Sequence, residues 1–172
     1  SHQAMGGLRQ LFDSLSREQR RNQDLLVSLA FAQRSFTNLQ RFLELVPLVA
    51  ARLVGVEGAL LVPFQMDGSL WRDHLQAIPA ASCQDLLRRL AAYEPGLSVG
   101  FGTDEEQLLA MDQLVQRLSP GSALFATSVV SRGRPRGRLY VFDPSGGLIC
   151  TDFQRRHVQM VADLAGVAIE ND

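Results

Sequence analysis

Two apolar runs, ALFATSVV at residues 123–130 and RLYVF at residues 138–142, decide the fold class of this chain. Both are rich in β-branched and aromatic residues, and the intervening SRGRPRG at residues 131–137 holds the glycines and proline that separate strands. The two runs therefore predict a β-hairpin. In the second run Leu139 and Val141 alternate with Tyr140 and Phe142, so both faces are apolar or amphipathic. Such a strand is covered by helices on at least one side.

The composition is typical of a soluble globular protein. The 172 residues are 46% hydrophobic and 20% charged, with a formal net charge of −1. A charge so near zero gives no long-range attraction to nucleic acid or anionic lipid, so we expect neither partner. No apolar run approaches the roughly 20 residues that cross a bilayer, and we expect no membrane segment. Cys83 and Cys150 form no CxxC motif, which favours a reducing cytoplasm.

A seven-residue repeat of apolar residues begins at Leu8. We interpret the patternless residues 1–7 before it as an expression scar without ordered structure. The repeat predicts a helix with a narrow apolar seam over residues 8–36. One set of repeat positions holds Leu8, Leu15, Asn22, Leu29, Phe36 and Leu43, and the other holds Leu11, Glu18, Leu25, Ala32, Leu39 and Val46.

Two interpretations of this seam are open. In the first, the helix pairs with a second copy of itself, and Asn22 fixes the register as polar seam residues do in two-stranded coils. In the second, the helix is amphipathic and lies on its own domain, which Glu18 favours because a seam carboxylate repels its symmetry mate. The dimer interface of the first interpretation contains Leu8, Leu11, Leu15, Asn22, Leu25 and Leu29.

Residues 37–172 predict a single further domain. The pattern indicates a helix from Asn38 to about Leu53, then a hairpin of residues 58–65 and 69–78 around Asp67-Gly68. Helices are predicted at residues 81–93 and 103–118. A last helix follows the capping-box sequence Thr151-Asp-Phe-Gln154. The expected fold class is therefore α+β.

This order of elements resembles that of a GAF domain. The similarity is strongest in Arg132-Gly133, in GRLYV at residues 137–141, in Phe153, and in VADLA at residues 161–165 running to VAIEN at 167–171. Residues 18–24, with Ser35-Phe36 and residues 39–45 after them, are similar to the GAF segments found upstream of bacterial sporulation-type metal-dependent Ser/Thr phosphatases. The resemblance implies a GAF-like central antiparallel sheet flanked by helices, preceded by a coiled-coil-type N-terminal helix.

Several chemistries of the GAF family lack their residues here. Cyclic-nucleotide-binding members carry an Asn-Lys-Phe-Asp-Glu set, whereas this chain contains no lysine. Bilin-binding members use a Cys-His or Cys-Phe pair, but Cys83 precedes Gln84 and Cys150 precedes Thr151. Free-methionine sulfoxide reductases of this fold use three cysteines, and this chain has two. We therefore expect no catalytic residue, no cofactor and no metal.

The remaining reactive residues have ordinary explanations beside chemical ones. His74 and His157 lack partners at ligand or triad spacing, so surface or core histidines are expected. Cys83 near a helix start is a packing residue or a redox sensor. The even-numbered residues from Arg132 to Arg138 share one face of the hairpin, which predicts a solvated rim; a partner-docking surface or a nucleic-acid contact is the alternative.

The resemblance implies a ligand pocket between the sheet and the helices after the first hairpin, and core packing is the alternative role for its residues. We expect a non-catalytic cytoplasmic sensory or regulatory domain that forms a homodimer. Because the sequence ends within a helical pattern, we expect an attached output domain, which the resemblance suggests is a Ser/Thr phosphatase. The alternatives are a ligand-free dimerisation scaffold and a small-molecule redox enzyme of the reductase type. The predicted pocket residues are Trp71, Leu75, Phe101, Met111 and Phe125.

Overall fold

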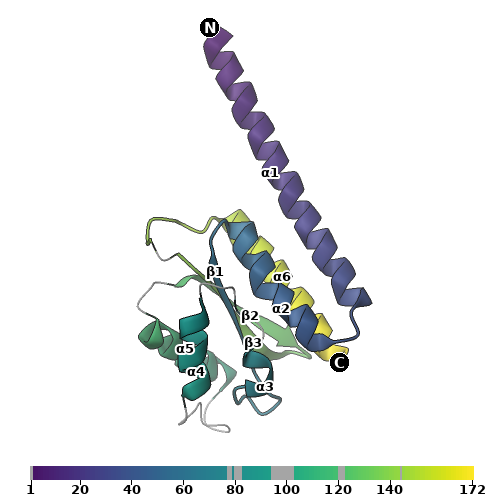
Figure 1. Ribbon diagram of the computed structural model, residues 1–172, viewed down its shortest axis with the longest axis vertical. Helices are drawn as coiled ribbons and strands as arrows, with labels where there is room; N and C mark the ends of the chain where they lie inside the picture. The colour runs from purple at the N-terminus through teal and green to yellow at the C-terminus, as the bar shows by residue number, and fades with distance from the viewer. Residues whose placement is uncertain (1, 77–78, 80–82, 94–102, 120–122, 144) are drawn as a thin grey trace.

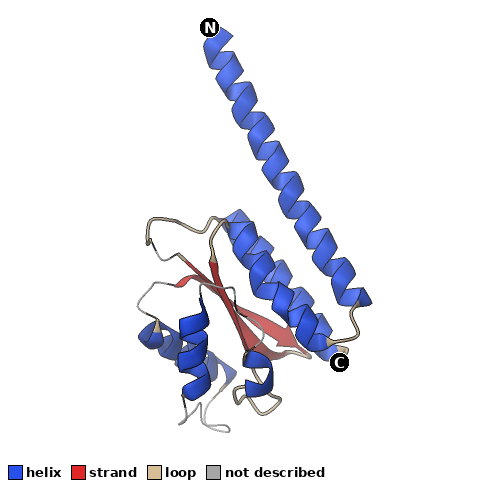
Figure 2. Cartoon of the chain, in the orientation of Figure 1, coloured by secondary structure: helices blue, strands red, loops and turns tan. Residues whose placement is uncertain are grey.

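An antiparallel sheet separates two layers of helices in the computed structural model (Figure 1, Figure 2). The structure describes residues 2–76, 79, 83–93, 103–119, 123–143 and 145–172. In this part of the chain the sheet contains β1 (Gly58–Pro63), β2 (Ala123–Ser131) and β3 (Arg134–Phe142), in the order β1-β3-β2. The helices are α1 (His2–Ser35), α2 (Leu39–Val54), α3 (Arg72–Leu75), α4 (Gln84–Ala92), α5 (Asp104–Leu118) and α6 (Asp152–Glu170). The predicted α+β class is confirmed.

The hairpin of β2 and β3 is present, but its turn is shorter than expected. Arg132 and Gly133 connect the strands with φ angles of 53° and 76°, the left-handed pair that a two-residue hairpin turn requires. Strand pairing therefore extends into residues that we expected in the loop, as far as Ser131 opposite Arg134. Pro135 lies at a register shift of this ladder, where its missing N–H is tolerated.

The alternation of β3 divides the core into two clusters, one on each face of the sheet. Leu139 and Val141 pack with α2 and α6. Tyr140 and Phe142 pack with residues of α4 and α5. All six positions of β1 are buried, because helices cover this strand on both faces.

The last helix lies directly on the hairpin. Its predicted capping box is confirmed: Thr151 Oγ1 accepts a hydrogen bond from the Gln154 N–H at 3.1 Å, and Gln154 Oε1 accepts one from the Thr151 N–H at 2.9 Å. Further along α6, a Cβ atom at Gly166 would overlap the carbonyl oxygen of Val130 in β2. Helix and strand therefore approach each other backbone to backbone.

The first predicted hairpin keeps its turn but loses its second strand. Asp67 Oδ1 accepts a hydrogen bond from the Ser69 N–H at 2.9 Å and closes the turn. A single bridge at Leu70 follows, after which α3 begins. The predicted strand is thus wrong over residues 72–75, because Trp71 and Leu75 are spaced for one helical turn. Residues 77–78 lie outside the described part.

Helix α1 begins at His2, so residues 2–7, expected to lack order, are helical. Each glycine lowers helix stability by only about 1 kcal/mol relative to alanine, so the helix continues through Gly6 and Gly7. The C-terminal half of α1 lies along α2 and α6, whereas its N-terminal half projects beyond the rest of the molecule (Figure 1). Among the described residues, no helix combines the length and apolarity needed to span a bilayer.

Candidate functional site

The four predicted pocket residues that the structure describes lie in three different surroundings. Leu75 and Met111 are fully buried in the cluster on the α4–α5 side of the sheet. Phe125 packs with the opposite cluster. Trp71 is half-buried and lines a hollow on the surface. Phe101 lies outside the described residues, so its prediction stands as it was.

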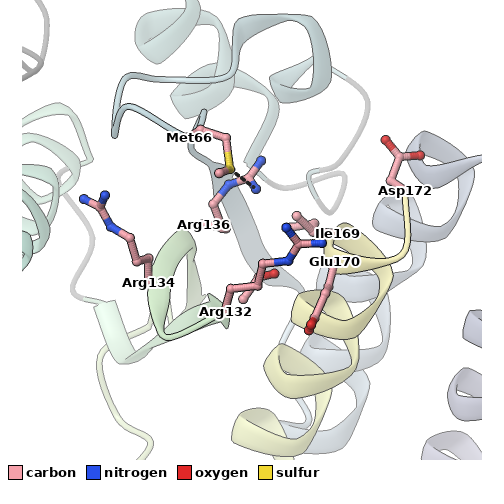
Figure 3. A pocket seen from close by; sticks show the side chains of 8 residues that line it. Met66, Arg132, Arg134, Arg136, Ile169, Glu170 and Asp172 are labelled. Atoms are coloured by element: carbon pink, nitrogen blue, oxygen red, sulfur yellow. Dashed lines mark hydrogen bonds between the residues drawn. The ribbon is translucent and has the colours of Figure 1, made fainter.

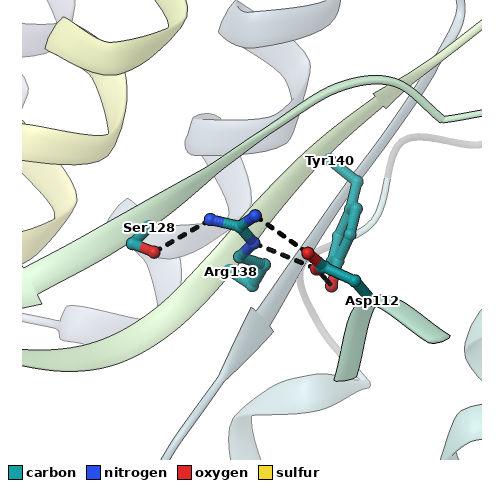
Figure 4. A network of polar contacts seen from close by, with 4 residues as sticks. All are labelled: Asp112, Ser128, Arg138 and Tyr140. Atoms are coloured by element: carbon teal, nitrogen blue, oxygen red, sulfur yellow. Dashed lines mark hydrogen bonds and ion pairs between the residues drawn. The ribbon is translucent and has the colours of Figure 1, made fainter. Parts of the chain in front are cut away.

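A polar network crosses the sheet on the α5 side (Figure 4). Asp112 of α5 accepts hydrogen bonds from Arg138 Nε at 3.0 Å, from Arg138 Nη2 at 2.9 Å and from the Tyr140 hydroxyl at 2.6 Å. Arg138 Nη1 also donates to Ser128 Oγ at 2.9 Å. The side chains of Arg138 and Asp112 are only 18% and 33% exposed. This bidentate ion pair therefore attaches α5 to β3, and the hydrogen bond from Arg138 to Ser128 extends the network to β2.

The network also keeps Tyr140 in its neutral form. Burial, and then the hydrogen bond to Asp112, raise the pKa of this phenol well above its ordinary value. The hydroxyl therefore stays a hydrogen-bond donor. Our sequence reasoning missed this network, because Asp112 and Arg138 are 26 residues apart and no local pattern links them.

The arginines of the hairpin differ in their partners, so a solvated rim describes only some of them. Arg134 is 62% exposed and forms an ion pair with Asp104 at 3.2 Å. Arg136 is half-buried; its Nε donates to the Phe64 carbonyl oxygen at 3.1 Å, and its Nη1 lies 3.1 Å from the Met66 sulfur (Figure 3). Within the described residues no carboxylate lies at ion-pair distance from Arg136.

Two hollows adjoin Arg136. One, of about 190 Å³, lies between the hairpin turn and the C-terminal end of α6 and includes Arg132 and Glu170 in its lining (Figure 3). The other, of about 310 Å³, is lined by Gln65, Met66, Asp67, Trp71 and Arg136. Met66 and Arg136 line both hollows and thus form the boundary between them.

The histidines have aromatic neighbours. His74 lies 4.2 Å from the Trp71 ring and His157 lies 4.3 Å from the Phe153 ring, centroid to centroid. The Nδ1 atom of each is buried and has no hydrogen-bond partner among the described residues. Burial also lowers the pKa of His157. In the same part of the chain, no three His, Cys, Asp or Glu side chains are grouped to hold a metal ion.

The predicted dimer seam is divided between two environments. Leu29 and Asn22 are 2% and 9% exposed, and Leu25 is half-buried against the cluster that α2 and α6 share. These three side chains face their own protomer, as in the second interpretation of the repeat. The other three, Leu8, Leu11 and Leu15, are 67%, 57% and 51% exposed on the projecting half of α1.

No protein-family model matches this sequence, and no curated protein matches it. Among solved structures, the chain is similar to the chromophore-binding domain of a bacteriophytochrome from Stigmatella aurantiaca, a variant in the Pr state, with a TM-score of 0.53 and 13% sequence identity. The match covers 88% of this chain and 60% of the phytochrome chain, so this chain spans less than two thirds of that protein. The helix-flanked antiparallel sheet and this similarity together show that the chain has a GAF-like fold.

Proposed function

We propose that this chain is a non-catalytic sensory or regulatory domain that pairs with a second copy through α1 and controls an attached output domain. The projecting half of α1 is the observation that supports pairing. A helical segment such as this free half of α1 has only marginal stability in water when no other element packs against it. Here the free half presents Leu8, Leu11, Phe12 and Leu15, each more than half exposed.

A second copy of α1 is the partner that fits this surface. Leu8 and Leu15 are seven residues apart, and in a parallel pair each seam residue meets its own counterpart. The seam is therefore complementary to itself. Asn22, where the seam enters the domain, marks the end of the free portion.

Signal transfer follows from the packing of α1 on α6. A ligand that binds one arrangement of these helices better than another shifts the population toward that arrangement. Because α6 lies backbone to backbone on β2, the shift reaches the sheet. For the output domain we propose a metal-dependent Ser/Thr phosphatase, on the resemblance of residues 18–24, 35–36 and 39–45. An assay of the full-length gene product for Ser/Thr phosphatase activity tests this part of the proposal.

Substitution of the free seam tests the pairing. We expect the double variant Leu8→Asp, Leu15→Asp to be a monomer whose domain stays folded, because both side chains are exposed in the protomer. Its helical circular dichroism should fall only by the amount that fraying of the free half of α1 accounts for. The matched control is Val27→Asp, Phe31→Asp, which changes two residues of α1 that are 63% and 65% exposed but lie outside the repeat. Light scattering of all three proteins at equal concentration gives the oligomeric state. A monomeric parent protein, or a dimeric seam variant, contradicts the proposal.

A ligand-free dimerisation scaffold is the second candidate. The complete burial of Leu75 and Met111 favours it, because these predicted pocket residues contribute to the core. Native mass spectrometry of freshly purified protein distinguishes the two functions: a repeatedly unliganded dimer supports the scaffold. The burial of both cysteines, Cys83 and Cys150, supports the proposal that the domain is not a redox enzyme, because a reactive thiol needs access to its substrate. An assay of methionine sulfoxide turnover tests this.

A further inference from the structure

We infer that the hollow beside Trp71 binds a small zwitterion, a molecule with one carboxylate, one ammonium group and an apolar remainder, such as a free amino acid. The inference rests on the proposed sensory function and names the class of signal. The hollow lies where the chain turns from β1 toward α3, against Arg136 of β3.

Arg136 supplies the positive charge. Its Nε–H and one Nη1–H are directed at the Phe64 carbonyl and the Met66 sulfur, which leaves three of its five N–H groups for a ligand. No carboxylate among the described residues lies within ion-pair distance of this half-buried guanidinium. Desolvation accordingly lowers the pKa of Arg136. A ligand carboxylate would provide the missing counter-charge with two parallel hydrogen bonds.

Asp67 supplies the negative charge at the same hollow. Its Oδ1 accepts hydrogen bonds from the Ser69 N–H at 2.9 Å and from the Ser69 hydroxyl at 2.6 Å. These bonds lower the pKa of Asp67, so the group is ionised at neutral pH. The structure gives its Oδ2 no partner among the described residues, so this oxygen is available to an ammonium group.

The rest of the lining suits an apolar group of small size. Trp71 and Met66 contribute an indole ring and a thioether, and the Arg136 guanidinium lies 5.4 Å from the centre of that ring. The volume of about 310 Å³ is at the lower end of the range for small-ligand sites, roughly 300–1,000 Å³. Gln65 completes the lining with a neutral amide.

The charge balance of the hollow selects the ligand class. One guanidinium and one carboxylate face the same space, so a simple anion would meet Asp67 and a simple cation would meet Arg136. Like charges brought together at a partly desolvated site repel each other. A zwitterion satisfies both groups at once.

Trp71 is the one tryptophan of the chain, so intrinsic fluorescence reports on this site directly. L-Leucine, L-methionine, L-phenylalanine and L-glutamine are titrated separately into the intact protein with excitation of tryptophan. We expect a saturable change with at least one of them. The matching amine and carboxylic acid, which each lack one charge, should bind at least about tenfold more weakly. The inference is overturned if none of the four amino acids gives a saturable change, or if a single-charge analogue binds as tightly as its amino acid.

Two variants assign the charges to residues. Arg136→Gln and Asp67→Asn should each weaken binding by about tenfold or more. The control variants Arg88→Gln and Asp85→Asn remove an exposed ion pair on α4 and should leave the titration unchanged. Circular dichroism checks folding, and should Arg136→Gln unfold the protein, the exposed Asp67→Asn decides alone; unaltered binding in that variant refutes the site. Light scattering of the same samples reports pairing, so loss of the ligand site and loss of the proposed dimer are distinguished.

Discussion

Asp112 accepts three hydrogen bonds from two side chains of β3, those of Arg138 and Tyr140. Arg138 is half-buried and Tyr140 is buried. An amide at this position cannot balance the charge of Arg138 and accepts fewer hydrogen bonds. We therefore expect Asp112→Asn to lower the free energy of unfolding by about 1–3 kcal/mol in urea titrations. Asp85→Asn is the control, because its ion pair with Arg88 is exposed and contributes little. Equal stability losses in the two variants would show that the network is unimportant.

The same network makes a pH-dependent contribution through Tyr140. Its folded-state pKa is raised, so this stability is fully present below the unfolded phenol pKa of about 10 and is lost as the pH rises above it. We expect the parent protein to lose stability steeply between about pH 9.5 and 11, and Tyr140→Phe to show a smaller slope over that range. Urea midpoints measured across this interval give both slopes. Identical slopes would mean that Tyr140 ionises in the folded protein.

Gly166 is required by the contact between α6 and β2. A methyl group there would overlap the Val130 carbonyl oxygen, and two backbones cannot separate without loosening the core. We expect Gly166→Ala to destabilise the fold by about 1–3 kcal/mol despite the better helix propensity of alanine. Gly147→Ala, at a glycine whose Cβ would have no neighbour within 4 Å, is the control in the same denaturation experiment. A stabilised Gly166→Ala variant would contradict the close approach.

At the scale of elements, α1 is one continuous helix with two different surroundings. Its second half belongs to the core through Leu29, whereas Phe31, two residues later, is 65% exposed. We expect Leu29→Ala to lower the free energy of unfolding by about 2–5 kcal/mol, because it opens a cavity between helices. Phe31→Ala should change it much less. Denaturant unfolding at a concentration where the protein has one oligomeric state measures both, and similar losses would refute the packing of α1 on its domain.

At the scale of the whole molecule, we expect the helical order of the projecting half of α1 to depend on the protein concentration. An unpartnered helix of this length frays, whereas a paired one protects its amide protons. We expect hydrogen exchange over residues 5–21 to be fast in dilute protein and at least about tenfold slower at concentrations that favour the dimer. Exchange in α2 and α6 should not depend on concentration. Protection of residues 5–21 that is equal at all concentrations would exclude a second copy as the partner.

The sequence by itself determined the elements whose signals are local. The Thr151-Asp-Phe-Gln154 capping box and the β2–β3 hairpin were predicted correctly, because each depends on residues close together in the chain. The alternation of β3 likewise predicted a covered strand. The prediction of a strand at residues 69–78 was wrong over residues 72–75. Strand pairing there is limited to one bridge at Leu70, and the following residues form a helical turn that buries Leu75.

Only the tertiary structure decided what these elements meet. A seven-residue apolar repeat describes both a dimer seam and a helix lying on its own domain, so the sequence left Leu15 and Leu29 equivalent. The fold separates them: Leu29 is covered by the protomer and Leu15 is exposed, because the domain extends along only half of α1. In the same way, Asp112 contacts Arg138, and Trp71 contacts Arg136, because segments distant in the sequence fold onto one sheet. No local spacing in the sequence predicts these contacts.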